Sequence, residues 1–448
     1  FFDTLSVQKG LSKILIDFST ASLQILLGLL LLSVYHPFFI LFSLILVLIV
    51  YLIFRYIAPK GLESSLTESK NKYEVAHWLE ELARTMDTFK LAGKSTLPLG
   101  RTDEKVGNYL KSRKTHFRHL VVQYIYLVGF KVVIAAGLLL IGGLLVINQQ
   151  MNIGQFVASE IVIILVLASV EKLILSMETI YDVLTAVEKI GNVADIALEK
   201  DEGTPEITNE NRGLNVIMEQ VSYQFQGENY KKLDAIDLQA APGEKVCISG
   251  TPGSGKTFLL QMLSGLYEDY TGFISINKLS LNGWCKEDLR NRIGHHFVLD
   301  DIFEGTILEN IILGRDVDFA DVQIALEAVG LSDYVRHLPM GLNTILVTEG
   351  RNLPGSLRLK ILLARSIVGT PDLILLDDSF NQMVKNDRDR FLKHILTSHA
   401  TTVVISNLPD VVKQFEKIVV LKDGKMLDQG SYQKLSKNDW FPEVYQMK

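Results

Sequence analysis

The sequence predicts an α-helical transmembrane bundle followed by an α/β P-loop domain. Long apolar runs are confined to residues 12–180. A loop of the form G-x-x-x-x-G-K-T occupies residues 250–257, and a later apolar strand ends in the carboxylates of Asp377 and Asp378. We therefore expect a membrane domain over residues 1–194, a linker over 195–213 and a soluble domain over 214–448.

Composition limits the class of protein before any motif is considered. The chain has 448 residues, a hydrophobic content of 48% and a formal net charge of −6. An acidic balance offers no basic surface for nucleic acid, so no nucleic-acid partner is expected. The two cysteines, Cys247 and Cys285, have no His or Cys partner at metal-binding spacing. We expect a reducing compartment and a buried strand around Cys247.

The membrane half contains four apolar segments of the length needed to cross a bilayer. They cover about residues 12–34, 38–56, 120–147 and 154–180. The third carries one charge, Lys131, and the fourth carries Glu160, Glu171 and Lys172. Lys131 and Glu171 lie at similar depths on neighbouring segments, so we expect them to form a pair. The alternatives to this pair are that each charge faces a water-filled cavity or extends to the membrane–water interface. Glu160 is expected to line the transport pathway near the outer side of the membrane.

The connections between these segments predict the orientation. Residues 35–37 and 148–154 contain no Lys or Arg, whereas residues 55–118 contain thirteen. Positively charged connections stay in the cytoplasm, so residues 55–118 and the soluble half are expected there. The sequence thus predicts a multi-pass protein of the plasma (inner) membrane.

The cytoplasmic connection has its own periodicity. Residues 75–84 place apolar side chains at helical spacing, which predicts an amphipathic helix between two long helices. Such a helix would lie on the membrane or dock onto the soluble domain. Residues 195–213 are polar and charged, as is typical of a linker.

The phosphate-binding loop lies in the context that its chemistry requires. A short apolar strand precedes residues 250–257 and a helical pattern follows them. Glycines let backbone N–H groups surround phosphates, and the helix N-terminus adds a positive dipole. Lys256 is expected to reach the β- and γ-phosphates of ATP, and Thr257 to ligate Mg²⁺. Residues 371–378 form the second half of such a site, with Asp377 organising Mg²⁺.

Five stretches resemble ATP-binding cassette transporters, in the order found in that family. They are residues 221–225, the phosphate loop, residues 289–310, residues 353–365 and residues 419–430. The membrane half resembles the last four of the six helices of an exporter half, and residues 151–156 resemble the same subtype. The resemblance implies that two further helices precede this chain. The chain begins at Phe1 without the features of a signal peptide, so we expect it to start inside a longer protein.

The resemblance also implies the site residues. Phe225 would stack on adenine, Asp378 and Asn407 would be catalytic, and Thr257 with Asp377 would hold Mg²⁺. The other nucleotide-binding residues implied are Gly250, Thr251, Pro252, Gly253, Ser254, Gly255, Lys256 and Phe258, with Gly355 and Ser356 of the signature helix.

Several positions depart from the family pattern. The departures are Val298 for the glutamine of the glutamine loop, Asp378 for the catalytic glutamate, Asn407 for the switch histidine, Pro354 for the signature serine, Ser356 for the second signature glycine, Leu357 for the signature glutamine, and Val384 for a dimer-contacting aspartate. The residues that grip nucleotide are intact, whereas those for hydrolysis are weakened.

The sequence therefore predicts an ATP-binding membrane subunit of an exporter, an ATPase-coupled translocase whose own turnover is weak. A second half-transporter, identical or different, and the lipid bilayer are the expected partners, and a periplasmic adaptor protein is a further candidate. Two alternatives remain at this stage. One is a hydrolysis-impaired regulatory half of a heterodimer, and the other is a non-transporting ATP sensor.

Overall fold

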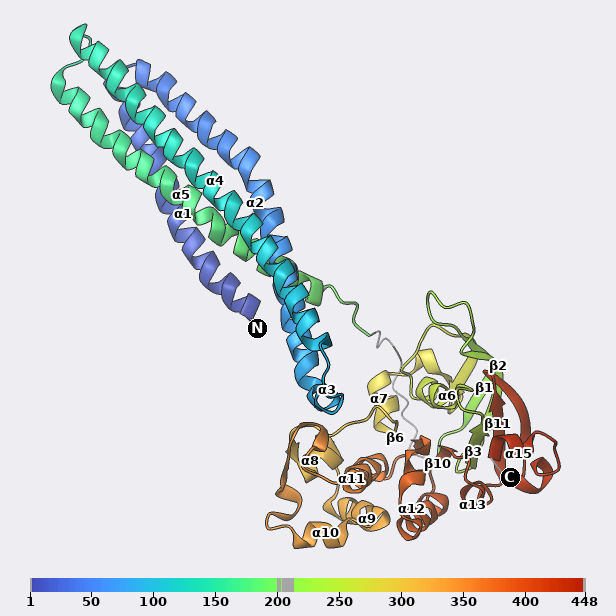
Figure 1. Cartoon of the computed structure of the whole chain (residues 1–448). Helices are drawn as coiled ribbons and strands as arrows, with labels where there is room; N and C mark the ends of the chain where they lie inside the picture. The colour runs from blue at the N-terminus through green and yellow to red at the C-terminus, as the bar shows by residue number, and fades with distance from the viewer. Residues whose placement is uncertain (1, 200–202, 204–212, 446–448) are drawn as a thin grey trace. The chain divides into compact units, whose positions relative to one another are not determined.

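The computed structural model describes residues 2–199, 203 and 213–445. It divides into two units, Phe1–Leu198 and Glu199–Lys448. The first is helical and the second is an α/β domain, which confirms the predicted fold class (Figure 1). The expected linker over residues 195–213 lies mostly outside the described residues.

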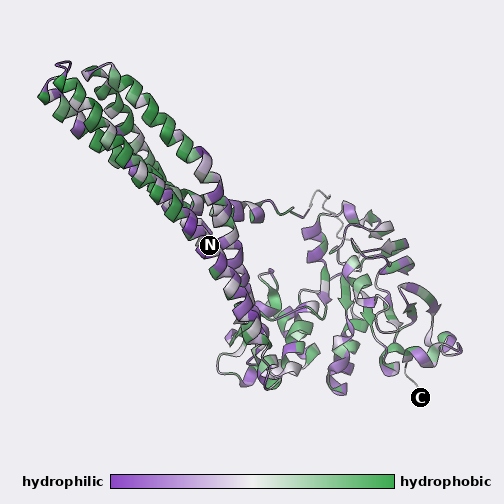
Figure 2. Cartoon of the chain, turned by 45° about the horizontal axis from the view of Figure 1, so that its top comes forward, coloured by the Kyte–Doolittle hydropathy of each residue, from purple (hydrophilic) through white to green (hydrophobic). Residues whose placement is uncertain are grey.

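Four long helices make up the first unit. They are α1 (Phe2–Tyr35), α2 (Phe38–Arg84), α4 (Leu97–Ile147) and α5 (Ile153–Ala194), with the short helix α3 (Met86–Leu91) between α2 and α4. All four are long and apolar enough to cross a membrane. Helix α1 packs along α5 and α2 packs along α4. Figure 2 shows that apolar residues gather toward the end that carries the α1–α2 and α4–α5 connections.

Each long helix continues beyond its apolar segment, and α2 differs most from expectation. Residues 75–84 are the last turns of α2 and do not form a separate helix. The side chain of Trp78 is buried, and its indole Nε1 donates to Thr102 Oγ1 of α4 at 3.0 Å. The apolar stripe of this segment therefore packs on α4. The prediction of a separate amphipathic helix was wrong, because these residues continue α2 without a break and their apolar stripe packs on α4.

The expected charge pair is confirmed. Lys131 Nζ of α4 forms an ion pair and hydrogen bond with Glu171 Oε2 of α5. The adjacent Lys172 Nζ lies 2.9 Å from Asp17 Oδ1 of α1. Glu171 and Lys172 of α5 thus form ion pairs with α4 and α1, respectively. Each of these ionised groups in an apolar segment has a partner of opposite charge, which offsets the cost of placing it there.

The contact predicts energetic coupling between Lys131 and Glu171. We expect Lys131→Ala and Glu171→Ala each to lower thermal stability in detergent, because either change leaves an unpaired charge. The double variant should lose less than the sum, with a coupling of at least about 0.5 kcal/mol. The matched control combines Lys131→Ala with Glu160→Ala, which should be additive. Additivity in the Lys131–Glu171 cycle would contradict the contact.

Two main sheets form the second unit. The larger has the order β12-β11-β3-β10-β9-β6, parallel except for the edge strand β12. Its strands are β3 (Lys245–Gly250), β6 (Ile293–His296), β9 (Leu373–Leu376), β10 (Thr401–Ile405), β11 (Lys417–Lys422) and β12 (Lys425–Gly430). The smaller sheet is antiparallel and contains β1 (Val216–Tyr223), β2 (Leu233–Ala240), β4 (Thr271–Ile276) and β5 (Leu279–Ser280). Strands β7 (Gly305–Thr306) and β8 (Ile345–Leu346) pair separately.

Helices cover both faces of the larger sheet. The α-helices are α6 (Lys256–Leu263), α7 (Lys286–Asn291), α8 (Ile307–Ile312), α9 (Phe319–Val329), α10 (Ser332–His337), α11 (Gly355–Ile367), α12 (Lys385–Thr397), α13 (Pro409–Val412), α14 (Tyr432–Leu435) and α15 (Phe441–Tyr445). Alternation along β3 sends Cys247 into one hydrophobic core and Val246 and Ile248 into the other. Burial on both faces is typical of a central parallel strand and agrees with the buried position expected for Cys247.

Candidate nucleotide-binding site

Strand order brings the separate motifs to one edge of the larger sheet. Strand β10 lies between β3 and β9 and is parallel to both. The phosphate loop follows β3, Asn407 follows β10, and Asp377 follows β9. Because the carboxyl ends of parallel strands meet at one edge, these residues share the place where open α/β sheets bind ligands.

Glycine is sterically required at two points of the loop. Gly250 has φ +148°, and a Cβ there would lie 2.0 Å from the Leu421 carbonyl oxygen. Gly255 has φ +91°, and its Cβ would lie 2.9 Å from the Lys232 carbonyl oxygen. By contrast, a Cβ on Gly253 would meet nothing within 4 Å. The loop is therefore held close to its own domain at both ends while its middle stays open, as a phosphate cradle requires.

Lys256 lies within this cradle. Its Nζ donates to the carbonyl oxygens of Gly250 at 3.0 Å and Thr251 at 2.7 Å. Burial lowers the pKa of Lys256, and the nearby carboxylates of Asp378 and Asp377 oppose that shift. The ammonium group is thus held by neutral carbonyls in a partly desolvated place, where an anionic phosphate would be a stronger partner.

Thr257 and Asp377 meet as the sequence predicts for a magnesium site. Thr257 Oγ1 donates to Asp377 Oδ2 at 3.2 Å, and Asp377 is 1% exposed. The other oxygen, Asp377 Oδ1, accepts from the backbone N–H of Asp378 at 2.6 Å. A hydroxyl beside a fixed carboxylate is a donor set that Mg²⁺ accepts together with phosphate oxygens. These residues therefore fit the ion that the motif implies.

Asp378 lies next to that carboxylate. Partial burial and the negative charge of Asp377 both raise the pKa of Asp378, while Lys256 opposes them. A raised pKa suits a group that accepts a proton, although the side chain is short for reaching an attacking water.

Asn407 has a role that the sequence did not predict. Its Oδ1 accepts from the Gly250 N–H at 3.1 Å, and its Nδ2 donates to the Gly250 carbonyl at 2.9 Å. The β10–β3 ladder ends at Ile405 opposite Ile248, so residue 407 falls opposite Gly250. The carboxamide carries the same donor and acceptor as a peptide group and extends the ladder by one step. The parallel register was the signal that could have revealed this contact.

Phe225, the expected adenine-stacking residue, packs within an aromatic cluster. The Phe225 ring lies 5.4 Å from the Phe258 ring and 5.1 Å from the Tyr223 ring, centroid to centroid. Phe258, predicted as a nucleotide-binding residue, is 5% exposed. Its side chain is a core residue beneath Phe225, which leaves only its backbone to contact a ligand. The Phe258 ring therefore packs Phe225 against α6, the helix that follows the phosphate loop.

The remaining predicted residues lie apart from the loop. Gly355 and Ser356 begin α11 after Pro354, and both are exposed. Within the described ranges, no hydrogen bond or ion pair joins them to residues 250–257. Val298, at the glutamine position, is 65% exposed and presents only an apolar side chain. The structure thus brings together Phe225, residues 250–258, Asp377, Asp378 and Asn407, but not the signature residues.

Comparisons with known proteins cover both units. A family model described as the ABC transporter transmembrane region matches residues 1–170, and one described as ABC transporter matches residues 233–381. The transport/processing ATP-binding protein ComA of Streptococcus pneumoniae is 26% identical, covering 96% of this chain and 60% of that protein. The ATP-dependent lipid A-core flippase of Burkholderia orbicola is 29% identical over 64% of this chain and 49% of its own length.

A solved structure shows the same fold. The structure of a bacterial Atm1-family ABC exporter with ATP bound superposes with a TM-score of 0.89 at 18% identity, covering 99% of this chain and 78% of that one. The present chain thus spans about half to three fifths of the length of the curated relatives above. The two family models, one for each unit, together match most of the chain, so the chain belongs to the ABC transporter family, with the transmembrane region and the ABC transporter domain of that family on one polypeptide.

Proposed function

We propose that this chain binds MgATP at residues 250–258 and couples its binding and slow hydrolysis to export across a membrane. The observation that carries the proposal is the convergence of the phosphate loop, Thr257 and Asp377 at one sheet edge, on a chain with four potential membrane helices. The relatives include a transport/processing protein and a lipid flippase. Their shared activity supports ATP-driven export as the general function.

The residues at this sheet edge divide nucleotide binding, metal binding and catalysis among them in the proposed function. Phe225 stacks on the adenine, the loop N–H groups and Lys256 hold the phosphates, and Thr257 with Asp377 holds Mg²⁺. Bound Mg²⁺ would supply charge neutralisation at the phosphates. Asp378 would orient the attacking water and accept its proton. Gly355 and Ser356 are exposed and separate from the loop, so they would complete the site of a second half-transporter.

The weakened hydrolysis is also part of the proposal. Asp378 is one methylene shorter than glutamate, and Val298 offers no polar group to water or metal. Asn407 makes two hydrogen bonds to Gly250, so turning toward a phosphate would require breaking both. Each of these features slows the chemical step more than it weakens nucleotide binding.

The lysine- and arginine-rich stretch over residues 55–118 supports the orientation we propose. It would lie in the cytoplasm with the ATP-binding domain, at the plasma (inner) membrane.

The Asn407 contact also favours a second candidate function, in which the chain is the slowly hydrolysing half of a heterodimer with a hydrolysis-competent partner. The exporter relatives do not favour a non-transporting sensor.

ATP turnover with and without a second half-transporter tests the proposed role. The chain alone should retain ATP and hydrolyse it slowly, and the pair should turn over faster. Gly355→Glu should reduce the turnover of the pair, because it obstructs the partner's site, while leaving ATP retention by this chain unchanged. Ser332→Glu, which places the same charge at the start of α10, is the control. Equal turnover with and without the second chain would contradict the role.

A further inference from the structure

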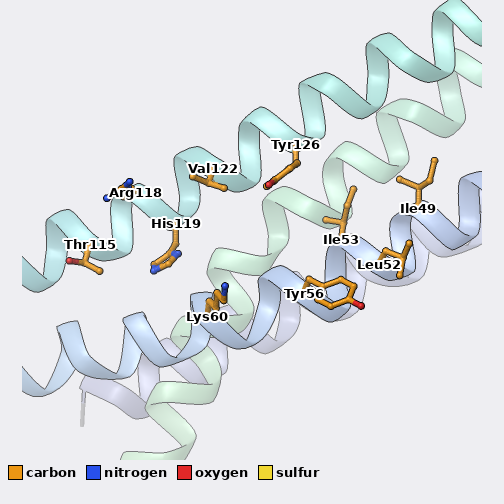
Figure 3. Close-up of a pocket in the computed structure, with 10 residues that line it drawn as sticks. All are labelled: Ile49, Leu52, Ile53, Tyr56, Lys60, Thr115, Arg118, His119, Val122 and Tyr126. Atoms are coloured by element: carbon orange, nitrogen blue, oxygen red, sulfur yellow. The ribbon is translucent and has the colours of Figure 1, made fainter.

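A groove in the helical unit carries a pattern of charge that the proposed function does not use. It lies between α2 and α4, has a volume of about 710 Å³, and is shown in Figure 3. The lining residues are Ile49, Leu52, Ile53, Tyr56, Lys60, Thr115, Arg118, His119, Val122 and Tyr126. Three of them are basic and none is acidic.

The polar and apolar residues occupy opposite ends of this groove. Lys60, Thr115, Arg118 and His119 lie at one end, and the aliphatic residues with Tyr126 extend from there (Figure 3). Lys60 comes just after the apolar part of α2, and Arg118 and His119 come just before the apolar part of α4. The change from basic to apolar therefore falls at the level where both helices enter the bilayer.

The basic side chains are available to a ligand. Within the part of the chain that the structure describes, no hydrogen bond or ion pair engages Lys60, Arg118 or His119. Figure 3 shows Lys60 and His119 pointing toward one another across the gap. An adjoining polar cavity of about 730 Å³ shares both residues and adds Lys111 and one acid, Glu63. The combined polar end keeps an excess of positive charge.

We propose that this groove binds an anionic glycerophospholipid of the cytoplasmic leaflet, the leaflet being set by the proposed orientation. Its phosphate would lie among Lys60, Arg118 and His119, and an acyl chain would follow Ile53, Val122 and Ile49. Basic residues at the membrane surface attract anionic headgroups, and tyrosines such as Tyr56 favour the interface. A free phosphate would leave the apolar end empty, and a zwitterionic lipid such as phosphatidylcholine would bring its own ammonium group into the basic end.

Native mass spectrometry of the full chain in a non-ionic detergent tests this proposal. We expect dioleoylphosphatidylglycerol to remain bound at concentrations where dioleoylphosphatidylcholine does not. Lys60→Gln combined with Arg118→Gln should weaken phosphatidylglycerol binding about 30-fold, since each basic residue contributes about fivefold. The matched control is Arg55→Gln with Lys114→Gln, which removes the same charge from the same two helices outside the groove. It should change binding less than about threefold.

A second measurement covers the case in which the charge-removing variant does not fold. Val122→Trp keeps all the basic residues and places a fluorophore in the apolar part of the groove. In nanodiscs, phosphatidylglycerol brominated on its acyl chains should quench this tryptophan more than brominated phosphatidylcholine, with the unmodified chain as background. Equal quenching, equal losses in both charge variants, or no bound phosphatidylglycerol would each overturn the proposal.

Discussion

The Lys256→Ala variant is expected to lose measurable MgATP binding while keeping its fold. Lys256 supplies the only ammonium group that we assign to the phosphates, and hydrogen bonds between charged groups contribute about 1.5–3 kcal/mol each. Losing two such bonds weakens affinity by on the order of 10²-fold or more. The loop itself should persist, because Asn407 still binds the backbone of Gly250. Isothermal calorimetry with MgATP measures the loss, and thermal unfolding checks the fold.

Phe225→Ala is the graded comparison for that experiment. It removes only the stacking surface for adenine, which contributes about 1–3 kcal/mol for a base on an aromatic ring. The affinity should fall less than in Lys256→Ala, since the phosphate contacts remain. An unchanged ATP affinity in Lys256→Ala would show that residues 250–257 are not the phosphate cradle.

Combining Asp378→Glu with Asn407→His is expected to raise the rate of ATP hydrolysis. A base must come within about 2.6–3.2 Å of the attacking water, and misplacement by roughly 1 Å costs on the order of 10²-fold. Glutamate restores the missing methylene at residue 378. Histidine at residue 407 gives up the double hydrogen bond to Gly250, and it can carry a positive charge toward the phosphate. We expect an increase of about 10- to 100-fold in steady-state phosphate release.

The single variants separate the two effects. Asp378→Glu alone should recover part of the rate, and Asn407→His alone should recover less, because a freed side chain helps little without a base in reach. Residues that act on one event do not contribute additively, so the double variant should exceed the product of the singles. A double variant no faster than the unmodified chain would show that these two residues do not limit hydrolysis.

The sequence predicted which residues the structure brings together wherever they belong to short local motifs. The phosphate loop, its helix and the Asp377 strand are each short motifs whose residue types fix their geometry. The Lys131–Glu171 pair was predictable too, because matched depth in a membrane leaves few other partners for a charge. Long-range register decided the rest. The two bonds of Asn407 depend on residue 407 lying opposite Gly250, which the pairing of β10 with β3 determines.

Two other features depended on neighbouring elements. The apolar stripe over residues 75–84 was visible, but its partner was not, and packing of Trp78 on α4 made it part of α2. The Phe258 side chain follows the loop in sequence, yet it packs beneath Phe225 because both lie over the same core. An apolar stripe or a motif in the sequence identifies which side chains are buried, whereas the fold determines which element they pack against.

Single-turnover hydrolysis of ATP by the unmodified chain tests the central claim most directly. The chain is loaded with less than one equivalent of radiolabelled MgATP, and intact ATP and ADP are followed over time, with Lys256→Ala as the non-binding control. We predict that the nucleotide stays bound and intact for about 10 to 100 times the turnover time of the variant that combines Asp378→Glu with Asn407→His. Rapid conversion to ADP by this chain alone, abolished by Asp378→Asn, would contradict the account and show that aspartate suffices as the base.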